Sequence, residues 1–143
     1  MTEKVMHGGR LLAMIIRKDF GGPGVEFITP DHASLQVGVL IHAKAATIQP
    51  HAHKPNPRTV TDTQEVLFIR KGRLRVDFYD EGKAYLESRI VGEGDALVLI
   101  SGGHGFEALE DVEIIEAKTG PYAGEDDKER FDADRPEKSI IPD

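Results

Sequence analysis

The sequence predicts an all-β protein whose antiparallel strands form a sandwich or a barrel. Short runs of apolar or alternating residues recur along the chain, separated by turns rich in glycine, aspartate and proline. No long segment shows the period of an amphipathic helix. Many short strands at regular spacing are typical of β-sandwiches and barrels. With 143 residues, the chain fits one domain that can bury a core.

Composition narrows the classes of function. The net charge of −7 disfavours a surface for nucleic acid or an anionic membrane. The absence of cysteine excludes disulfides and thiolate ligands, so imidazole and carboxylate must hold any metal. The first apolar run, Leu11–Ile16, is too short for a secretory signal or a membrane span. We expect a cytoplasmic protein.

The first 34 residues are expected to form N-terminal strands that pack on the main body. Leu11–Ile16 has the length of a buried or edge strand. A turn with three glycines and a proline follows, and Val25–Ile28 is a second short strand. Alternation over Leu35–Ile41 then places four aliphatic side chains on one face.

The middle of the chain holds a pair of histidines followed by a loop. Ala46–Gln49 leads into His51 and His53, which share a face if the segment is extended, because side chains alternate along a strand. Residues 53–64 contain two prolines and many polar groups, so they are expected to form a surface loop.

The second half of the chain is dense in strands joined by tight turns. Strands are expected over Glu65–Arg70, Arg73–Tyr79, Ala84–Val91, Ala96–Ile100, His104–Leu109 and Val112–Ala117. Alternation in the second of these puts Arg73 and Arg75 on a face opposite Leu74 and Val76, which we expect to be solvated. Residues 121–143 form a charged C-terminal extension, with a turn or two of helix over Gly124–Phe131.

Three imidazoles and one carboxylate are candidate metal ligands. Glu65 shares a face with Leu67 and Ile69, so its carboxylate points inward and needs a cationic partner there. His104 lies in a second glycine-rich stretch. Together with His51 and His53, these residue types suit a divalent first-row transition metal.

The order of these residues resembles that of the cupin superfamily. HAH, QEVLFIRKG and Gly72 match its first motif, and GDALVLISGGH matches its second. The resemblance implies a double-stranded β-helix, or jelly-roll barrel, over residues 35–120. It also implies metal ligation by His51, His53, Glu65 and His104, with Zn, Fe, Mn or Ni as the metal.

Three departures from the cupin pattern leave the subfamily open. The gap between His53 and Glu65 is wider than usual, and Ser101 and Gly102 stand near a usual proline. Ala108 replaces an asparagine that is often found after the second motif's histidine. The resemblance implies a metal-dependent isomerase or dioxygenase that acts on a small sugar-like or carboxylate-like metabolite.

Other interpretations remain open beside this one. The protein is also compatible with a binding cupin that has no turnover, or with a metal-free enzyme, similar to sugar epimerases, that uses His51 or His53 as a base. His42 is expected in the core or on the surface rather than as a ligand, and Arg58 in an exposed loop. We expect a homodimer, in which the strand at Leu11–Ile16 is exchanged or pairs at an edge.

Overall fold

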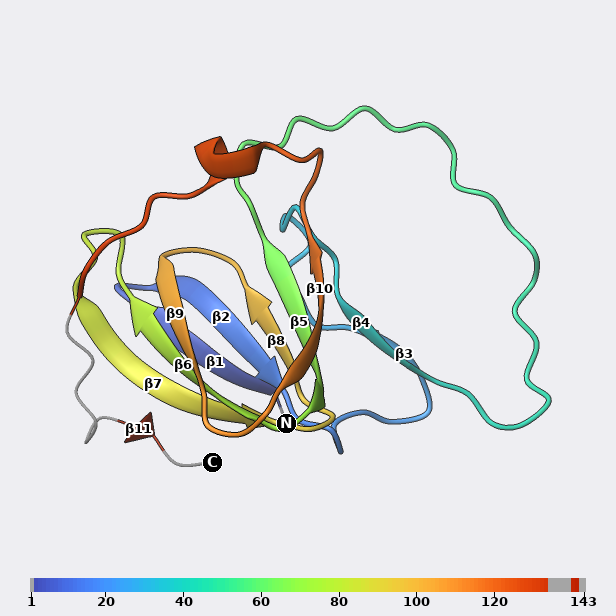
Figure 1. Ribbon diagram of the computed structural model, residues 1–143. Helices are drawn as coiled ribbons and strands as arrows, with labels where there is room; N and C mark the ends of the chain where they lie inside the picture. Colours follow the sequence, from blue (N-terminus) through green and yellow to red (C-terminus); the bar gives the residue numbers. More distant parts are fainter. Residues whose placement is uncertain (1, 134–139, 142–143) are drawn as a thin grey trace.

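The computed structural model describes residues 2–133 and 140–141, and in this part of the chain it is built from β-strands (Figure 1). The strands are β1 (Thr2–His7), β2 (Arg10–Ile16), β3 (Gly24–Phe27), β4 (Gly38–Ile41), β5 (Glu65–Lys71), β6 (Arg73–Tyr79), β7 (Tyr85–Gly92), β8 (Ala96–Leu99), β9 (Gly103–Ala108), β10 (Glu113–Lys118) and β11 (Ile140–Ile141). One 3-10 helix, η1, spans Gly124–Asp127. The described residues contain no helix long and apolar enough to cross a membrane.

The strands form two larger sheets and one separate hairpin. The first sheet has the order β1-β2-β8-β5-β10, the second has the order β11-β7-β6-β9, and β3 pairs with β4. Neighbours are antiparallel except β11 and β7, which run parallel. The prediction of an all-β protein with antiparallel sheets is confirmed.

The two larger sheets do not close into a barrel in the described part of the chain. β9 ends the second sheet and β10 ends the first, so these consecutive strands belong to different sheets and do not pair with each other. The expectation of a closed barrel is therefore wrong for this conformation. The sandwich is open along the side where β9 and β10 lie.

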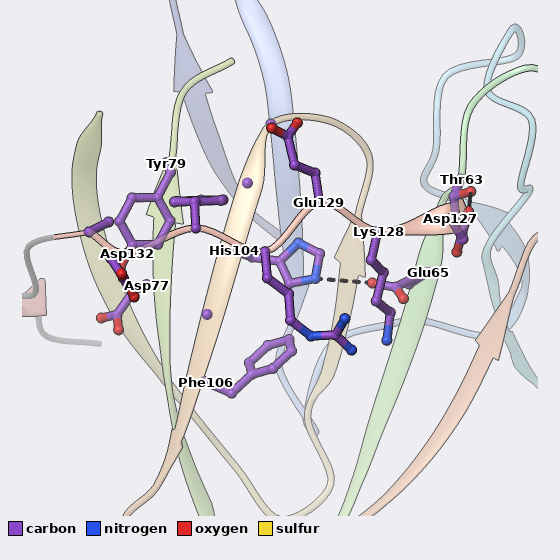
Figure 2. Close-up of a pocket in the computed structure, with 16 residues that line it drawn as sticks. Thr63, Glu65, Asp77, Tyr79, His104, Phe106, Asp127, Lys128, Glu129 and Asp132 are labelled. Carbon is purple, nitrogen blue, oxygen red and sulfur yellow. Dashed lines mark hydrogen bonds and ion pairs between the residues drawn. The ribbon is translucent and has the colours of Figure 1, made fainter. Parts of the chain in front are cut away.

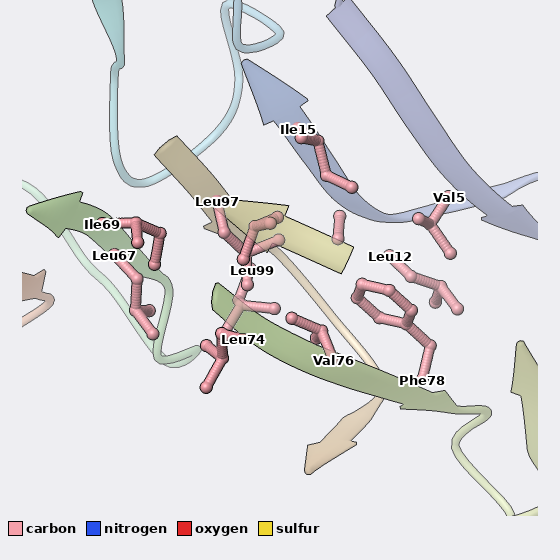
Figure 3. Packing of buried hydrophobic residues seen from close by; sticks show 12 residues of the cluster. Val5, Leu12, Ile15, Leu67, Ile69, Leu74, Val76, Phe78, Leu97 and Leu99 are labelled. Atoms are coloured by element: carbon pink, nitrogen blue, oxygen red, sulfur yellow. The ribbon is translucent and has the colours of Figure 1, made fainter. Parts of the chain in front are cut away.

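The main core lies between the two sheets (Figure 3). Alternation decides which side chains enter it, because residues i and i+2 of a strand share a face. From β6, Leu74, Val76 and Phe78 point inward and meet Leu67 and Ile69 of β5. The rest of this cluster is formed by Val5, Leu12, Ala13, Ile15, Val91, Leu97 and Leu99.

A second cluster lies on the outer face of the first sheet. Its buried members are Met14, Ile16, Val66, Ala96 and Val98. Leu35, Val37 and Val39 pack against it, so the predicted apolar face is confirmed for these three residues, whereas Ile41 is 42% exposed. β4 itself begins only at Gly38. The segment between β3 and β4 thereby covers much of the sheet.

β2 is an interior strand. It pairs with β1 on one side and with β8 on the other, and its last five residues are buried. The buried alternative for Leu11–Ile16 is confirmed, and the expectation of an edge strand there is wrong, because β2 has a neighbour on each side. Exchange of this strand between two copies stays a prediction. The edge is instead occupied by β1, which the sequence did not indicate because its residues are mostly polar.

The expected solvated face of β6 is largely buried. Arg75 is 4% exposed and Asp77 is 0% exposed. Arg75 Nε donates to Asp77 Oδ1 at 2.8 Å, and the Ser88 hydroxyl donates to the same oxygen at 2.5 Å. Tyr85 extends this polar group through a 2.8 Å hydrogen bond between its hydroxyl and that of Ser88. Because each charge has partners, burial is tolerated.

The C-terminal segment meets the second sheet at two places. The ring of Phe131 stands edge-on to Tyr79 at a centroid distance of 5.2 Å, and β11 pairs with β7. The expected helical turns shrink to η1. Residues 134–139 and 142–143 of the expected extension lie outside the described residues.

Residues 42–63 form a long exposed segment, which we call the arm. The arm leaves β4, arcs away from the sandwich and returns to β5 (Figure 1). The surface loop expected over residues 53–64 is confirmed up to Thr63, whereas Gln64 is buried. Ala46–Gln49, expected to lead into the histidines as an extended segment, has no strand partner.

Candidate functional site

Glu65 and His104 meet across the open side of the sandwich. Glu65 is the first residue of β5 in the first sheet, and His104 is the second residue of β9 in the second sheet. His104 Nε2 lies 3.2 Å from Glu65 Oε2 (Figure 2). The side chains are 30% and 12% exposed, respectively, so the pair is shielded but reachable from solvent.

Strand register places both groups on the inner face. Glu65 points to the same side as Leu67 and Ile69, which are buried in the core, as the sequence predicts. His104 stands opposite Phe78 in the β6–β9 ladder, and Phe78 is also a core residue. The inward carboxylate has the partner that its desolvation requires.

The pair changes the acidity of the carboxyl group. The hydrogen bond from His104 lowers the pKa of Glu65 from its ordinary value of 4.5, against the opposing effect of burial. The positive charges of Lys118 and Lys128 add to this lowering of the pKa. Lys118 is the register partner of Glu65 on β10, so the sheet itself supplies one of these cations. Glu65 is therefore an ionised carboxylate at neutral pH.

A pocket of about 740 Å³ surrounds this pair (Figure 2). Its size lies within the range of small-molecule sites in proteins. The wall combines aromatic and charged side chains, namely Tyr79, Phe106, Asp77, Lys128, Arg130 and Phe131. A ligand with both apolar surface and polar groups therefore meets a matching mixture of groups.

Residues 127–133 pass over the pocket, and we call them the strap. Thr63 Oγ1 donates to Asp127 Oδ1 at 2.5 Å, and Lys83 Nζ lies 2.5 Å from Glu129 Oε1. Lys83 Nζ also lies 5.6 Å from the centroid of the Phe131 ring. These contacts hold the strap above the site.

The backbone before His104 requires glycine. Gly102 has φ +74°, a left-handed conformation that side chains disfavour. A Cβ there would lie 2.6 Å from the carbonyl oxygen of Tyr79, and a Cβ on Gly103 would lie 2.9 Å from the Phe131 ring. Gly102 and Gly103 thus let the chain turn into β9 beneath the strap. This turn sets the position of His104, the second residue of β9.

His51 and His53 lie on the exposed arm, away from Glu65 and His104. Their rings stand edge to face at a centroid distance of 5.5 Å, and His51 Nδ1 is 3.0 Å from the carbonyl oxygen of Gln49. In residues 2–133 and 140–141, no three or more histidines and acidic side chains gather closely enough to hold a metal ion. Of the four predicted ligands, the structure brings Glu65 and His104 together and leaves His51 and His53 apart from them.

The remaining three histidines and Arg58 lie outside this pocket. His42 is exposed at the start of the arm, and His7 Nε2 lies 3.8 Å from Asp80 Oδ2. His32 and Arg58 line a separate hollow of about 990 Å³. Arg58 is exposed, as expected, and donates to the carbonyl oxygen of Asn56 at 3.3 Å.

Sequence reasoning missed the strap. Lys128, Arg130 and Phe131 line the pocket, but they belong to a charged stretch with few apolar residues that predicts a solvated extension. Phe131 is the one large apolar side chain among these residues, and its contact with Tyr79 could not be predicted from local pattern.

Comparison with known proteins identifies no relative. No protein-family model matches the chain, and neither a curated protein nor a solved structure matches it significantly.

Proposed function

We propose that the protein is a cupin-like metal-binding protein whose pocket takes a small polar metabolite. In this proposal, Glu65 and His104 are two ligands of a divalent transition metal, and His51 and His53 join them when the arm moves onto the open side of the sandwich. The arm would then pair as added strands and complete a double-stranded β-helix.

The observation that carries this proposal is the contact between Glu65 and His104. The two residues lie far apart in the sequence and on different sheets, yet their side chains meet at 3.2 Å on the inner face. The contact joins an ionised carboxylate and an imidazole, which are ligand types that zinc, iron, manganese and nickel share. A bound metal of this kind supplies Lewis acidity toward oxygen atoms of a ligand.

The other pocket residues favour a metabolite with hydroxyl or carboxylate groups. Lys128 lies close enough to Glu65 to lower its pKa, so it places positive charge near the pair. Tyr79 and Phe106 add aromatic surface on which the carbon skeleton of a small ligand can pack. The strap residues above shield part of the pocket from water.

A second candidate is a metal-free binding protein or acid–base enzyme. The hydrogen bond between His104 and Glu65 favours it, because this bond gives the two groups a partner without any metal. In this case His104 could exchange a proton with a ligand while Glu65 orients its ring. An epimerase-like reaction that uses His51 or His53 as the base has less support, since both lie on the exposed arm.

Elemental analysis of purified protein separates the two candidates. The wild type is compared with His104→Ala and with His51→Ala/His53→Ala, and His42→Ala serves as a matched control because it removes an exposed histidine from the start of the arm. The proposal predicts a near-stoichiometric metal that is lost in the first two variants and kept in the control.

The element found then selects the reaction to assay. Iron points to dioxygen uptake with candidate substrates, and zinc, nickel or manganese points to isomerisation. If the wild type holds no metal after incubation with each ion, or if both histidine variants retain it, the metal-binding proposal is wrong and the metal-free candidate takes its place.

A further inference from the structure

We infer that the arm docks on the β9 edge of a second copy of this chain, so that two copies exchange arms. The docking itself follows from strand edges, charge and exposed apolar surface. Its consequence for the site rests on the function proposed above.

The receiving surface is the open side of the sandwich. Within the described strands, β9 pairs only with β6 and β10 pairs only with β5. No strand in the described residues pairs with the outer side of β9 or β10, and an unpaired sheet edge of this kind is a template for strand addition. All six residues of β10 are exposed.

The arm has the properties of a segment that needs a partner. Residues 42–63 are exposed throughout and contain no strand. Structureless segments longer than about 15 residues are uncommon inside a compact domain and are usually functional. The arm also carries Ile48, which is 60% exposed.

Charge favours contact between the arm and the open side. From His42 to Thr61 the chain has no acidic residue, and it carries Lys44, Lys54 and Arg58 in addition to three histidines. Residues 103–118, which comprise β9, β10 and the turn that joins them, carry five acidic residues, namely Glu107, Glu110, Asp111, Glu113 and Glu116. Opposite charges on facing surfaces steer association and fix its orientation.

Apolar side chains lie on both surfaces as well. Phe106 on β9 is 42% exposed and Ile115 on β10 is 52% exposed. On the side of the arm, the β3–β4 hairpin exposes Val25, Phe27 and Leu40. Two copies that exchange arms would bury both sets, and burial of apolar surface contributes about 25 cal/mol per Å².

The course of the arm favours docking on the β9 edge of a second copy over docking on the β9 edge of its own chain. β4, where the arm begins, belongs to the segment that packs on the outer face of the first sheet, whereas β9 is the far edge of the second sheet. In Figure 1 the arm arcs away from its own β9. Reciprocal exchange of identical segments gives a closed dimer with twofold symmetry.

Exchange makes the candidate site composite. An arm added at the β9 edge of the second copy brings His51 and His53 beside the β9 strand that carries His104. The site of each copy then takes two imidazoles from its partner, and neither copy alone can complete the proposed ligand set.

A charge-swap experiment tests the docking independently of any metal. One variant carries Lys44→Glu, Lys54→Glu and Arg58→Glu in the arm. A second variant carries Glu110→Lys and Asp111→Lys in the turn between β9 and β10, and Glu116→Lys in β10. All six positions are exposed, so both variants are expected to fold. Light scattering should show that the wild type is a dimer and that each variant alone is a monomer. A mixture of the two variants should be a dimer again, because each arm in the mixed pair then faces an edge of opposite charge. Wild-type monomers, or variants that stay monomeric when mixed, overturn the inference.

Cross-linking distinguishes exchange from closure within one chain. Because the chain has no cysteine, Ala52→Cys in the arm and Glu107→Cys on β9 provide the only thiols. A short bismaleimide should join the two single variants into a covalent heterodimer and should link the double variant into dimers. A control with Ala52→Cys and Glu93→Cys, an exposed turn position, should not cross-link. A double variant that cross-links only within one chain overturns exchange.

Metal complementation then separates the two proposals. His104→Ala and His51→Ala/His53→Ala are each expected to lack metal, whereas a mixture refolded together should recover about one site per mixed dimer, because one arm and one edge remain intact. A metal-binding wild type without such recovery contradicts the composite site. A wild type that passes the charge-swap and cross-linking tests but binds no metal contradicts only the proposed function.

Discussion

His104 on β9 donates through Nε2 to Oε2 of Glu65 on β5 at 3.2 Å, and this contact links the two sheets at the open side of the sandwich. It is the point at which the candidate site, the strap and the open strand edges come together. The two groups depend on each other, because the carboxylate orients the imidazole and the imidazole stabilises the charge of the carboxylate.

Replacing His104 by alanine is expected to raise the pKa of Glu65 toward its ordinary value of 4.5, since the hydrogen bond from His104 is the largest cause of its lowering. An NMR titration of the glutamate side-chain carboxyl carbons measures this shift. Glu125, whose pKa is lowered mainly by Arg130, serves as an internal control that should not change. An unchanged Glu65 titration would show that the contact does not form in solution.

The same pair is expected to contribute an acid-sensitive part of the stability. A carboxyl whose folded pKa is lowered stabilises the protein at pH above its unfolded pKa, and this contribution is lost as the pH falls through the lowered folded value. Unfolding by urea at pH 7 and at pH 3 should therefore show a smaller loss of stability on acidification for Glu65→Gln than for the wild type. Equal losses in both proteins contradict the prediction.

Replacing Asp77 by alanine is expected to destabilise the fold by about 3–5 kcal/mol, because it removes a carboxylate to which the buried Arg75 guanidinium donates at 2.8 Å. Urea unfolding measures the change. Asp19→Ala is the matched control, since Asp19 is exposed and should cost less than about 0.5 kcal/mol. A loss below about 1 kcal/mol for Asp77→Ala would mean that water replaces the carboxylate.

Gly72 is expected to tolerate no side chain at the turn between β5 and β6. It has φ +84°, and a Cβ there would lie 2.1 Å from the carbonyl oxygen of Asp111. Gly72→Ala should cost more than about 1 kcal/mol, which combines left-handed strain with a clash against backbone. Thermal unfolding of both variants measures the change. Gly22→Ala is the control and should cost little, because a Cβ there would meet nothing within 4 Å.

Phe131 is expected to hold the strap on the second sheet through its contact with Tyr79. Phe131→Ala should therefore increase amide hydrogen exchange in residues 127–133 while leaving exchange in the core strands unchanged. Tyr122→Ala is a suitable control, because Tyr122 is 89% exposed and precedes the strap. Unchanged exchange in the strap would show that the charged contacts alone hold it.

Much of the fold follows from local pattern. β5, β6 and β8 combine apolar alternation or runs with clear turn signals, so their positions and inward faces could be predicted. β1 could not be predicted, because only Val5 of its six residues is buried and an edge strand of polar residues has no periodic pattern. The burial of Arg75 and Asp77 could not be predicted, because alternation places these charged residues on the face opposite the core, and their partner Ser88 lies on another strand.

Of the four candidate ligands, the sequence predicts the positions of Glu65 and His104 but not those of His51 and His53. Glu65 and His104 sit on well-defined strands, so alternation and motif order together placed them on the inner face. His51 and His53 belong to a segment that makes few contacts within its own chain, and residue spacing alone does not fix where such a segment docks. Their position depends on the strand edge that receives the arm.

The most direct test of the metal-binding proposal is an NMR titration of all six histidine rings with Zn²⁺, in which ring nitrogen shifts report ligation residue by residue. We predict that His51, His53 and His104 shift together at one equivalent of metal, while His7, His32 and His42 remain unchanged. Saturation without a shift of His104, or shifts confined to the exposed pair His51 and His53, would contradict a metal centre at Glu65 and His104.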